Sequence, residues 1–127
     1  MGWQHYKELI VWQKAMLLTD EIYTLVKLLP KEELFALSDQ MRRAAVSIPS
    51  NIAEGHGRQT EKEYRQFLSV AKGSVCELET QIEIGVRQNY FTCNEAHAAL
   101  SLCDEVRKML TTMILQQSQN SKLTAQN

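Results

Sequence analysis

Residues 37–58 read Leu-Ser-Asp-Gln-Met-Arg-Arg-Ala-Ala-Val-Ser-Ile-Pro-Ser-Asn-Ile-Ala-Glu-Gly-His-Gly-Arg. Apolar side chains recur in this stretch at steps of three and four, the spacing that brings residues onto one face of an α-helix. They are Met41, Ala45, Ile48 and Ile52. The stretch therefore predicts one long helix with its apolar face in a core.

A second row of mostly small polar residues follows the same helix beside the apolar one. Its members are Gln40, Arg43, Ser47, Asn51 and Glu54. An exposed helix face more often carries Lys and Glu, so this row indicates a second packed contact, either inside a bundle or between subunits. A solvated face explains the row equally well, and the pattern leaves both interpretations open.

Pro49 lies in the middle of the predicted helix. A proline there removes the hydrogen bond to the Ala45 carbonyl and crowds that group. Because the apolar spacing continues in phase across Pro49, we expect a kink and not a break. Gly55 and Gly57 then predict the end of the helix, since glycine adopts the left-handed conformation of a C-terminal cap at little cost.

The preceding segment predicts a helix over residues 9–29, with two adjoining apolar stripes as expected for a helix packed on two neighbours. One stripe contains Leu9, Trp12, Met16, Tyr23 and Val26, and the other contains Leu18, Ile22, Leu25 and Leu29. Pro30 ends this helix. The next helix begins either in the acidic segment 31–33 or at Ser38 as its N-cap, and the pattern allows both.

Two capping boxes predict the starts of two more helices. In each, a Thr is followed three residues later by a Glu, Thr60 with Glu63 and Thr92 with Glu95. Their side chains can bond to the free backbone N–H groups of the first helical turn. Helical spacing then continues to about residue 88 in the third helix and to residue 115 in the fourth.

Gly73 and Ser74 place small side chains in the middle of the third helix. A glycine there costs about 1 kcal/mol relative to alanine, and close contact with another helix would offset this cost. If the second and third helices are antiparallel about a turn near Arg58, Arg43 lies opposite Gly73 and within one turn of Glu77. We therefore expect a partly buried Arg43–Glu77 ion pair.

These elements predict an all-α protein, an up-down-up-down four-helix bundle in one domain over residues 1–115. Residues 116–127 are polar without helical spacing and predict a disordered tail. No apolar run is long enough to span a membrane. Cys76, Cys93 and Cys103 form no C-x-x-C pair, which predicts free thiols in the reducing cytoplasm. Cys103 falls on the core spacing of the fourth helix.

Charge gives the only candidate binding site, because no metal-ligand spacing, cofactor loop or catalytic group is evident. We therefore expect no cofactor, no metal and no enzymatic activity. The net charge is −1, but residues 38–73 carry six Lys and Arg against four Asp and Glu. Arg58, Lys62, Arg65 and Lys72 lie near the predicted turn and indicate a surface for phosphate backbones. Alternatively, these bases only solubilise the surface or pair with neighbouring acids.

The motifs described so far resemble those of small four-helix bundle proteins encoded in intervening sequences of bacterial 23S ribosomal RNA genes. The resemblance covers roughly residues 9–86. It rests on Val11-Trp12-Gln13-Lys14-Ala15, on Ile22-Tyr23, on Leu37-x-x-Gln40-x-Arg42-Arg43-Ala44, on Ser47-Ile48-Pro49-x-Asn51-Ile52-Ala53-Glu54-Gly55 and on Phe67-Leu68-x-x-Ala71-x-Gly73-Ser74-x-x-Glu77-Leu78-Glu79-Thr80. The fold is also similar to that of accessory proteins of diversity-generating retroelements.

The resemblance implies a homopentamer. The retroelement relatives bind nucleic acid and a reverse transcriptase through a basic pentameric surface, whereas the ribosomal-gene members have no established activity. We expect either a homo-oligomeric module that binds structured RNA or a ribonucleoprotein, or a protein-interaction scaffold without a role in nucleic-acid binding. Candidate residues at an interface between helices or subunits are Gln40, Arg43, Ser47, Asn51, Glu54, Gly73, Ser74 and Glu77.

Overall fold

The computed structural model describes the backbone of residues 5–126 and the side chains of residues 5–119. All regular elements in this part of the chain are helices. The four α-helices are α1 (Ile10–Leu25), α2 (Leu37–His56), α3 (Glu61–Arg87) and α4 (Cys93–Gln126). Three short 3-10 helices are η1 (Tyr6–Glu8), η2 (Val26–Leu28) and η3 (Lys31–Glu33). The prediction of an all-α protein with four helices is confirmed.

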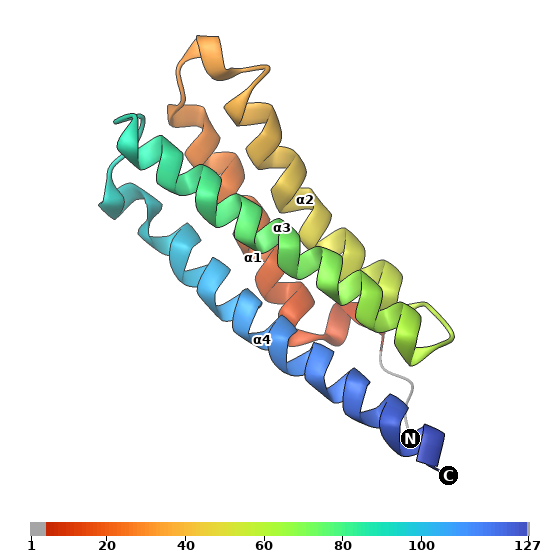
Figure 1. Cartoon of the computed structure of the whole chain (residues 1–127). Coiled ribbons are helices and arrows are strands. Elements are labelled where there is room, and N and C mark those ends of the chain that lie inside the picture. Colours follow the sequence, from red (N-terminus) through yellow and green to blue (C-terminus); the bar gives the residue numbers. More distant parts are fainter. Residues whose placement is uncertain (1–4, 127) are drawn as a thin grey trace.

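The four helices lie alongside one another, and each runs opposite in direction to the one before it (Figure 1). Contacts join α1 to α2 and α4, and α3 to α2 and α4. The α1–α2 connection, which contains η2 and η3, lies at one end of the bundle, and the α2–α3 turn lies at the other (Figure 1). Since α2 has 20 residues, its two ends are about 30 Å apart at 1.5 Å per residue.

The buried side chains of α2 are those that the apolar spacing predicts. Met41, Ala45, Ile48 and Ile52 are fully buried in the core. In α1, however, the buried side chains follow the second predicted stripe and extend it towards the N-terminus. They are Val11, Ala15, Leu18, Ile22 and Leu25. Met16 and Tyr23, members of the other stripe, remain exposed, so α1 has a narrower buried face than its composition suggests.

Both predicted N-caps are confirmed, the Thr92–Glu95 capping box in full and the Thr60–Glu63 box in its threonine half, since the Glu63 carboxylate accepts the Thr60 hydroxyl at 3.0 Å. Thr60 Oγ1 accepts a hydrogen bond from the Glu63 backbone N–H at 3.1 Å. Thr92 and Glu95 bond reciprocally, because Thr92 Oγ1 accepts from the Glu95 N–H at 3.0 Å and Glu95 Oε1 accepts from the Thr92 N–H at 2.9 Å. These bonds satisfy donors that have no partner within the first turn of a helix, and they fix where α3 and α4 begin.

The second helix begins near the later of its two predicted starts, at Leu37, while residues 31–33 form the separate 3-10 helix η3. It continues across Pro49 as one helix, and the bend at that residue stays a prediction. The prediction that a left-handed glycine cap ends this helix is wrong. No glycine in the described chain has a positive φ, and Gly57 follows the last helical residue with a φ of −82°, so α2 ends without a left-handed cap.

Gly55 instead permits a close approach of α2 and α3. A Cβ atom added at Gly55 would lie 2.6 Å from Phe67 Cβ and 3.1 Å from Tyr64 Cδ1. Side chains cannot pack at such separations without a shift of the backbone. The glycine is therefore required by interhelical packing and not by a helix cap.

The last helix is longer than the predicted domain. The structure continues α4 through residues 116–126, where the sequence predicts a tail without secondary structure, and Asn127 lies outside the described residues. The chain has no Pro or Gly after Gly85, so no helix-breaking residue separates this segment from the rest of α4. Within the described chain, no helix combines the length and apolar character needed to cross a bilayer.

Candidate interaction surfaces

Three polar side chains of the predicted interface set meet between α2 and α3. Ser47 Oγ and Ser74 Oγ are 2.9 Å apart. Asn51 Nδ2 donates to the Ser47 carbonyl oxygen at 2.8 Å and to Ser47 Oγ at 3.0 Å. The Ser47 hydroxyl therefore accepts from Asn51 and has its own proton available for Ser74. We call the line of contact around these residues the α2–α3 seam.

The charged residues of the set on α2, Arg43 and Glu54, pair with residues four positions away in the sequence. Arg43 is 80% exposed and pairs with Asp39 at 3.1 Å, while Glu54 pairs with Arg58 at 2.9 Å. Gln40 is exposed. The predicted Arg43–Glu77 ion pair is therefore wrong.

The orientation of Arg43 on α2, and not the register of the two helices, explains this error, because the side chain is exposed and bonds to Asp39. A turn centred near Arg58 would put Ser47 opposite Ser69, whereas Ser47 contacts Ser74, five residues further along α3. Glu77 accepts a hydrogen bond from Gln81 Nε2 at 3.3 Å on its own helix. Counting residues from the turn therefore predicts the direction of α3 but gives a register that is five residues off, and this shift still leaves Arg43 level with Glu77.

Two features beside the α2–α3 seam have no explanation within one chain. Gly73 is exposed, and a Cβ atom added to it would have no atom of another residue within 4 Å. Gln81 is only 5% exposed, and its Oε1 atom has no hydrogen-bond partner among the described side chains and backbone. The close helix contact predicted at Gly73 is therefore not made inside a single bundle.

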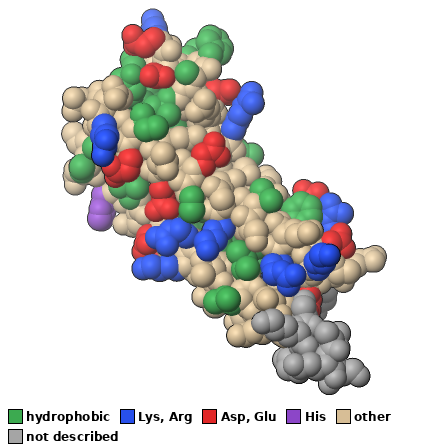
Figure 2. Space-filling model, in the orientation of Figure 1, with side chains coloured by type: hydrophobic (Ala, Val, Ile, Leu, Met, Phe, Trp, Pro, Cys, Tyr) green, Lys and Arg blue, Asp and Glu red, His purple; other side chains and the backbone are tan. Residues whose placement is uncertain are grey.

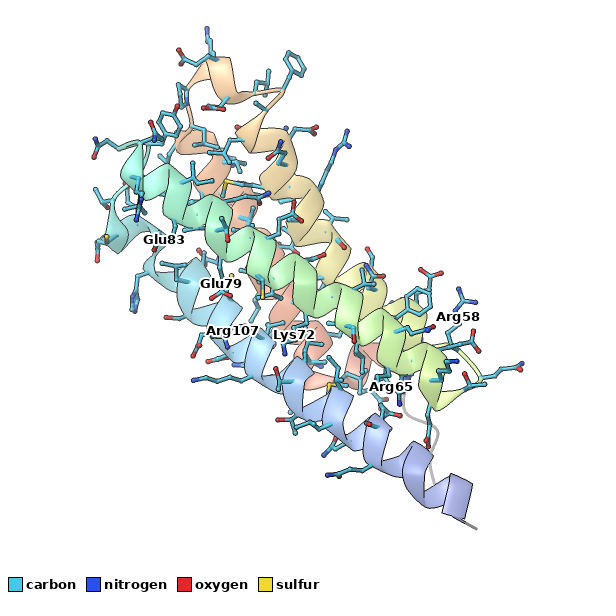
Figure 3. The ribbon with its side chains drawn as sticks, in the orientation of Figure 1. Arg58, Arg65, Lys72, Glu79, Glu83 and Arg107 are labelled. Carbon is cyan, nitrogen blue, oxygen red and sulfur yellow. The ribbon has the colours of Figure 1, made fainter. Side chains whose placement is uncertain are left out.

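The four bases predicted to bind phosphate do not form one cluster. Arg58 is bonded to Glu54, and its guanidinium carbon lies 4.9 Å from the centre of the Phe67 ring. Lys62 is exposed, and Arg65 and Lys72 are half-buried. Figure 3 shows Arg65 and Lys72 along the side of α3 next to α4, whereas Arg58 lies at the α2–α3 turn.

Charge changes sign along this side of α3. Arg65, Lys72 and Glu79 are spaced by seven residues and lie on one line of the helix. Glu79 accepts from Arg107 Nε on α4 at 3.3 Å, so this line faces α4. Lys and Arg side chains gather across the middle of this face of the molecule (Figure 2). Lys72 lies near Arg107 in Figure 3, with Glu79 and Glu83 towards the α3–α4 connection.

Asp104 pairs with two of the bases of α4 and so offsets part of their positive charge. Its carboxylate pairs with Lys108 at 2.9 Å and also with Arg107. The hydrogen bond from Lys108, together with the charges of both cations, lowers the pKa of Asp104. Arg107 is thus held between Asp104 and Glu79, which leaves Lys62 and Lys72 as the bases in this region with no ion pair among the described side chains.

A second basic site lies at the α1–α2 connection, and the sequence did not point to it. A pocket of about 290 Å³ is lined there by Val26, Lys27, Leu29, Pro30, Lys31, Leu34, Ser38 and Arg42. We call it the turn pocket. Phe35 follows Leu34 and is 91% exposed. A bulky aromatic residue in a polar connection between two helices could have indicated this site in the sequence, but Phe35 belongs to no helical spacing.

The cysteines are free thiols in two environments. Cys76 and Cys93 are exposed, while Cys103 is buried. Burial, with a smaller contribution from the Glu79 carboxylate, raises the pKa of the Cys103 thiol to about 12, so this thiol stays protonated. Its prediction as a core residue is confirmed. Among the described residues, no group of His, Cys, Asp and Glu side chains could hold a metal ion.

The helices and their surfaces define a small four-helix bundle whose candidate sites are interaction surfaces. The model of the 23S rRNA-intervening sequence protein family matches residues 7–112, and the chain belongs to this family. It is also similar to the crystal structure of a protein with unknown function from the S23 ribosomal protein family of Bacteroides thetaiotaomicron VPI-5482. The two chains are 26% identical with a TM-score of 0.77, over 83% of this chain and 98% of the other. A comparison with curated proteins finds no match.

Proposed function

We propose that this protein is a non-enzymatic subunit of a closed homo-oligomer, a pentamer, which binds structured RNA or a ribonucleoprotein in the bacterial cytoplasm. Assembly is the central part of the proposal. The ring would use the α2–α3 seam and the adjoining side of α3, and it would repeat the bases near Lys62 and Lys72 around its circumference. Repetition raises the local positive potential although each chain has a net charge of only −1.

The observation that carries assembly is the open space at Gly73. A glycine in the middle of a 27-residue helix costs about 1 kcal/mol relative to alanine, and packing inside the chain does not require it. Val70 and Ile84, which share this side of α3 by helical spacing, are exposed apolar residues. A neighbouring helix against Gly73 would account for both features.

Light scattering tests assembly directly. The parent protein is expected to have the mass of a closed oligomer, and Gly73→Leu is expected to reduce this mass towards that of one chain. Its isolated fold should persist, because the substituted side chain has free space there. Ala98→Leu, at an exposed position on α4, is the matched control and should leave the mass unchanged. A monomeric parent, or an unchanged mass in Gly73→Leu, would overturn this mode of assembly.

Titration with an RNA duplex tests the binding function. Binding is expected at low salt and should weaken as salt rises, because phosphate contacts release counterions. The double variant Lys62→Gln, Lys72→Gln should bind less well than the parent. The control variant Lys7→Gln, Arg87→Gln removes the same charge from exposed positions elsewhere and should bind as the parent does. Equal affinities in both variants would remove RNA from the proposal.

The second candidate function is a scaffold that binds protein and no nucleic acid. A groove of about 310 Å³ between α1 and α2 favours it, since its wall is largely apolar. Its lining residues are Tyr6, Trp12, Met16, Thr19, Val46, Pro49, Ser50 and Ala53. An oligomeric parent that binds no RNA at low salt would select this function over the first.

A further inference from the structure

The turn pocket has an arrangement of charge that differs from the rest of the surface. Three of its lining residues, Lys27, Lys31 and Arg42, are cations, and no acid lines it. None of the three forms an ion pair with another described side chain. Bases elsewhere on the helices, such as Arg43, Arg58 and Arg107, are bonded to carboxylates. The pocket therefore has positive charge without an internal counter-ion.

The acids of the same connection are engaged elsewhere. Glu33 accepts the Tyr90 hydroxyl at 2.8 Å through Oε2, and through Oε1 it accepts the Leu37 backbone N–H at 3.3 Å. The hydrogen bond to Glu33, and the nearby charge of Glu32, raise the pKa of Tyr90. Glu33 is thus bonded to Tyr90 and to the start of α2, and neither Glu32 nor Glu33 lines the pocket.

Apolar residues make up part of the pocket wall. Val26, Leu29 and Leu34 line the pocket together with the cations. Phe35 adjoins Leu34, so its Cα lies about 3.8 Å from that of a wall residue, and its ring is almost fully exposed to solvent. An exposed aromatic ring has no role in the core of this bundle, but it offers a face on which another planar ring can stack.

We propose that the turn pocket and Phe35 together bind one nucleotide unit of a single-stranded nucleic acid, with its phosphate among the three cations and its base stacked on Phe35. Bases in a duplex are stacked on one another and unavailable to an aromatic side chain, whereas bases of a single strand can stack on one. The site lies at the opposite end of α2 from the α2–α3 turn (Figure 1). The inference is therefore separate from the duplex binding proposed for Lys62 and Lys72.

Fluorescence anisotropy with a short, labelled oligoadenylate tests the stacking part. Phe35→Leu keeps an apolar side chain but removes the aromatic face, and it should lower affinity about five-fold or more, the lower range for loss of one base stack. Phe35→Trp keeps an aromatic face and should bind at least as tightly as the parent. Equal binding by Phe35→Leu and the parent would overturn the site, as would the absence of binding by the parent at low salt.

The charge part has its own variant and control. Lys31→Gln, Arg42→Gln should weaken binding of the oligoadenylate and reduce its salt dependence, since each phosphate neutralised on a single strand contributes a slope of about 0.7. The control Lys7→Gln, Arg87→Gln removes the same charge from exposed positions elsewhere and should leave this binding unchanged, and the pocket variant should leave duplex binding unchanged. Far-UV circular dichroism and light scattering verify that each variant has the fold and the mass of the parent.

Competitors distinguish the sources of the anionic group. Inorganic phosphate and adenosine monophosphate should both compete, the nucleotide at lower concentration because it adds the base. Polyglutamate should compete poorly. If polyglutamate displaces the oligoadenylate as well as an unlabelled strand does, and the Phe35 variants behave alike, the pocket recognises acidic protein segments and the proposal is wrong.

Discussion

The glycines near the ends of α3 and the glycine in its middle have opposite surroundings. Near one end of α3, Gly55 of α2 has Phe67 and Tyr64 of α3 against its Cα, and near the other end Gly85 lies under the Phe91 ring. In the middle, Gly73 faces open space. The ends are therefore packed within the chain as closely as glycine allows, while the middle is a place where something outside the chain can come equally close. Substitutions at these positions should differ in sign as well as in size.

The largest effect is expected for Gly55→Ala. The added Cβ would lie 2.6 Å from Phe67 Cβ, an atom that cannot move without its backbone, so α2 and α3 must separate. We expect the free energy of unfolding to fall by about 3 kcal/mol, at the upper end of the range for overpacking. Gly57→Ala is the matched control, because its Cβ would meet nothing closer than 3.6 Å and its φ suits alanine. Urea denaturation of both variants measures the difference, and equal stabilities would contradict the packing role of Gly55.

Gly85→Ala should have the next largest effect. Its Cβ would lie 2.2 Å from Phe91 Cζ, so the buried ring must turn away from α3. Because a ring moves more easily than a backbone, the expected loss is smaller, about 2 kcal/mol. The double variant Gly85→Ala, Phe91→Leu removes the clashing atoms and should lose less stability than the two single changes added together. Additive losses would show that Gly85 and Phe91 do not interact in this way.

The sequence pattern predicted correctly the features that are determined within a single helix. The core face of α2 and the threonine N-caps of α3 and α4 follow from residues close in sequence, and the structure has them where predicted. The polar row on α2 was also recognised, and Ser47 and Asn51 bond to each other and, through Ser47, to Ser74. That contact lies within one chain, and the subunit interface stays a prediction.

The failures concern relations between segments. The register of α2 and α3, counted from the turn, was five residues off, as the Ser47–Ser74 contact shows, but this shift still leaves Arg43 level with Glu77. The predicted ion pair fails because the Arg43 side chain is 80% exposed and bonds to Asp39. Phe35 was missed for a different reason. It lies in a connection, where side-chain exposure follows from the path of the backbone and not from a repeating pattern.

Gly73→Ala should change stability by a smaller amount and in the opposite direction. In dilute solution, where any oligomer has dissociated, alanine should raise the free energy of unfolding by up to about 1 kcal/mol, because it favours the helix and meets no neighbour. At higher concentration the added methyl group should weaken a closely packed subunit contact. Denaturation at two protein concentrations measures both effects. A stabilisation that is equal at both concentrations would mean that this side of α3 stays open in solution.

The smallest effects are expected at the arginines of α2 and its turn, although the sequence predicted a partly buried ion pair for Arg43. Arg43 and Arg58 each pair with an acid four residues earlier, Asp39 and Glu54, and the Arg43 side chain is 80% exposed. Exposed pairs of this kind contribute about 0.3–0.5 kcal/mol, so Arg43→Ala should cost no more than that in the separate chain. Arg58→Ala should cost slightly more, since the guanidinium also lies over the Phe67 ring. Chemical denaturation at low and high salt checks the order, because added salt should diminish the loss at Arg43 almost completely and that at Arg58 only in part. A loss of several kcal/mol at Arg43 that appears only at high protein concentration would mean that Arg43 is buried between subunits and not between the helices of one chain.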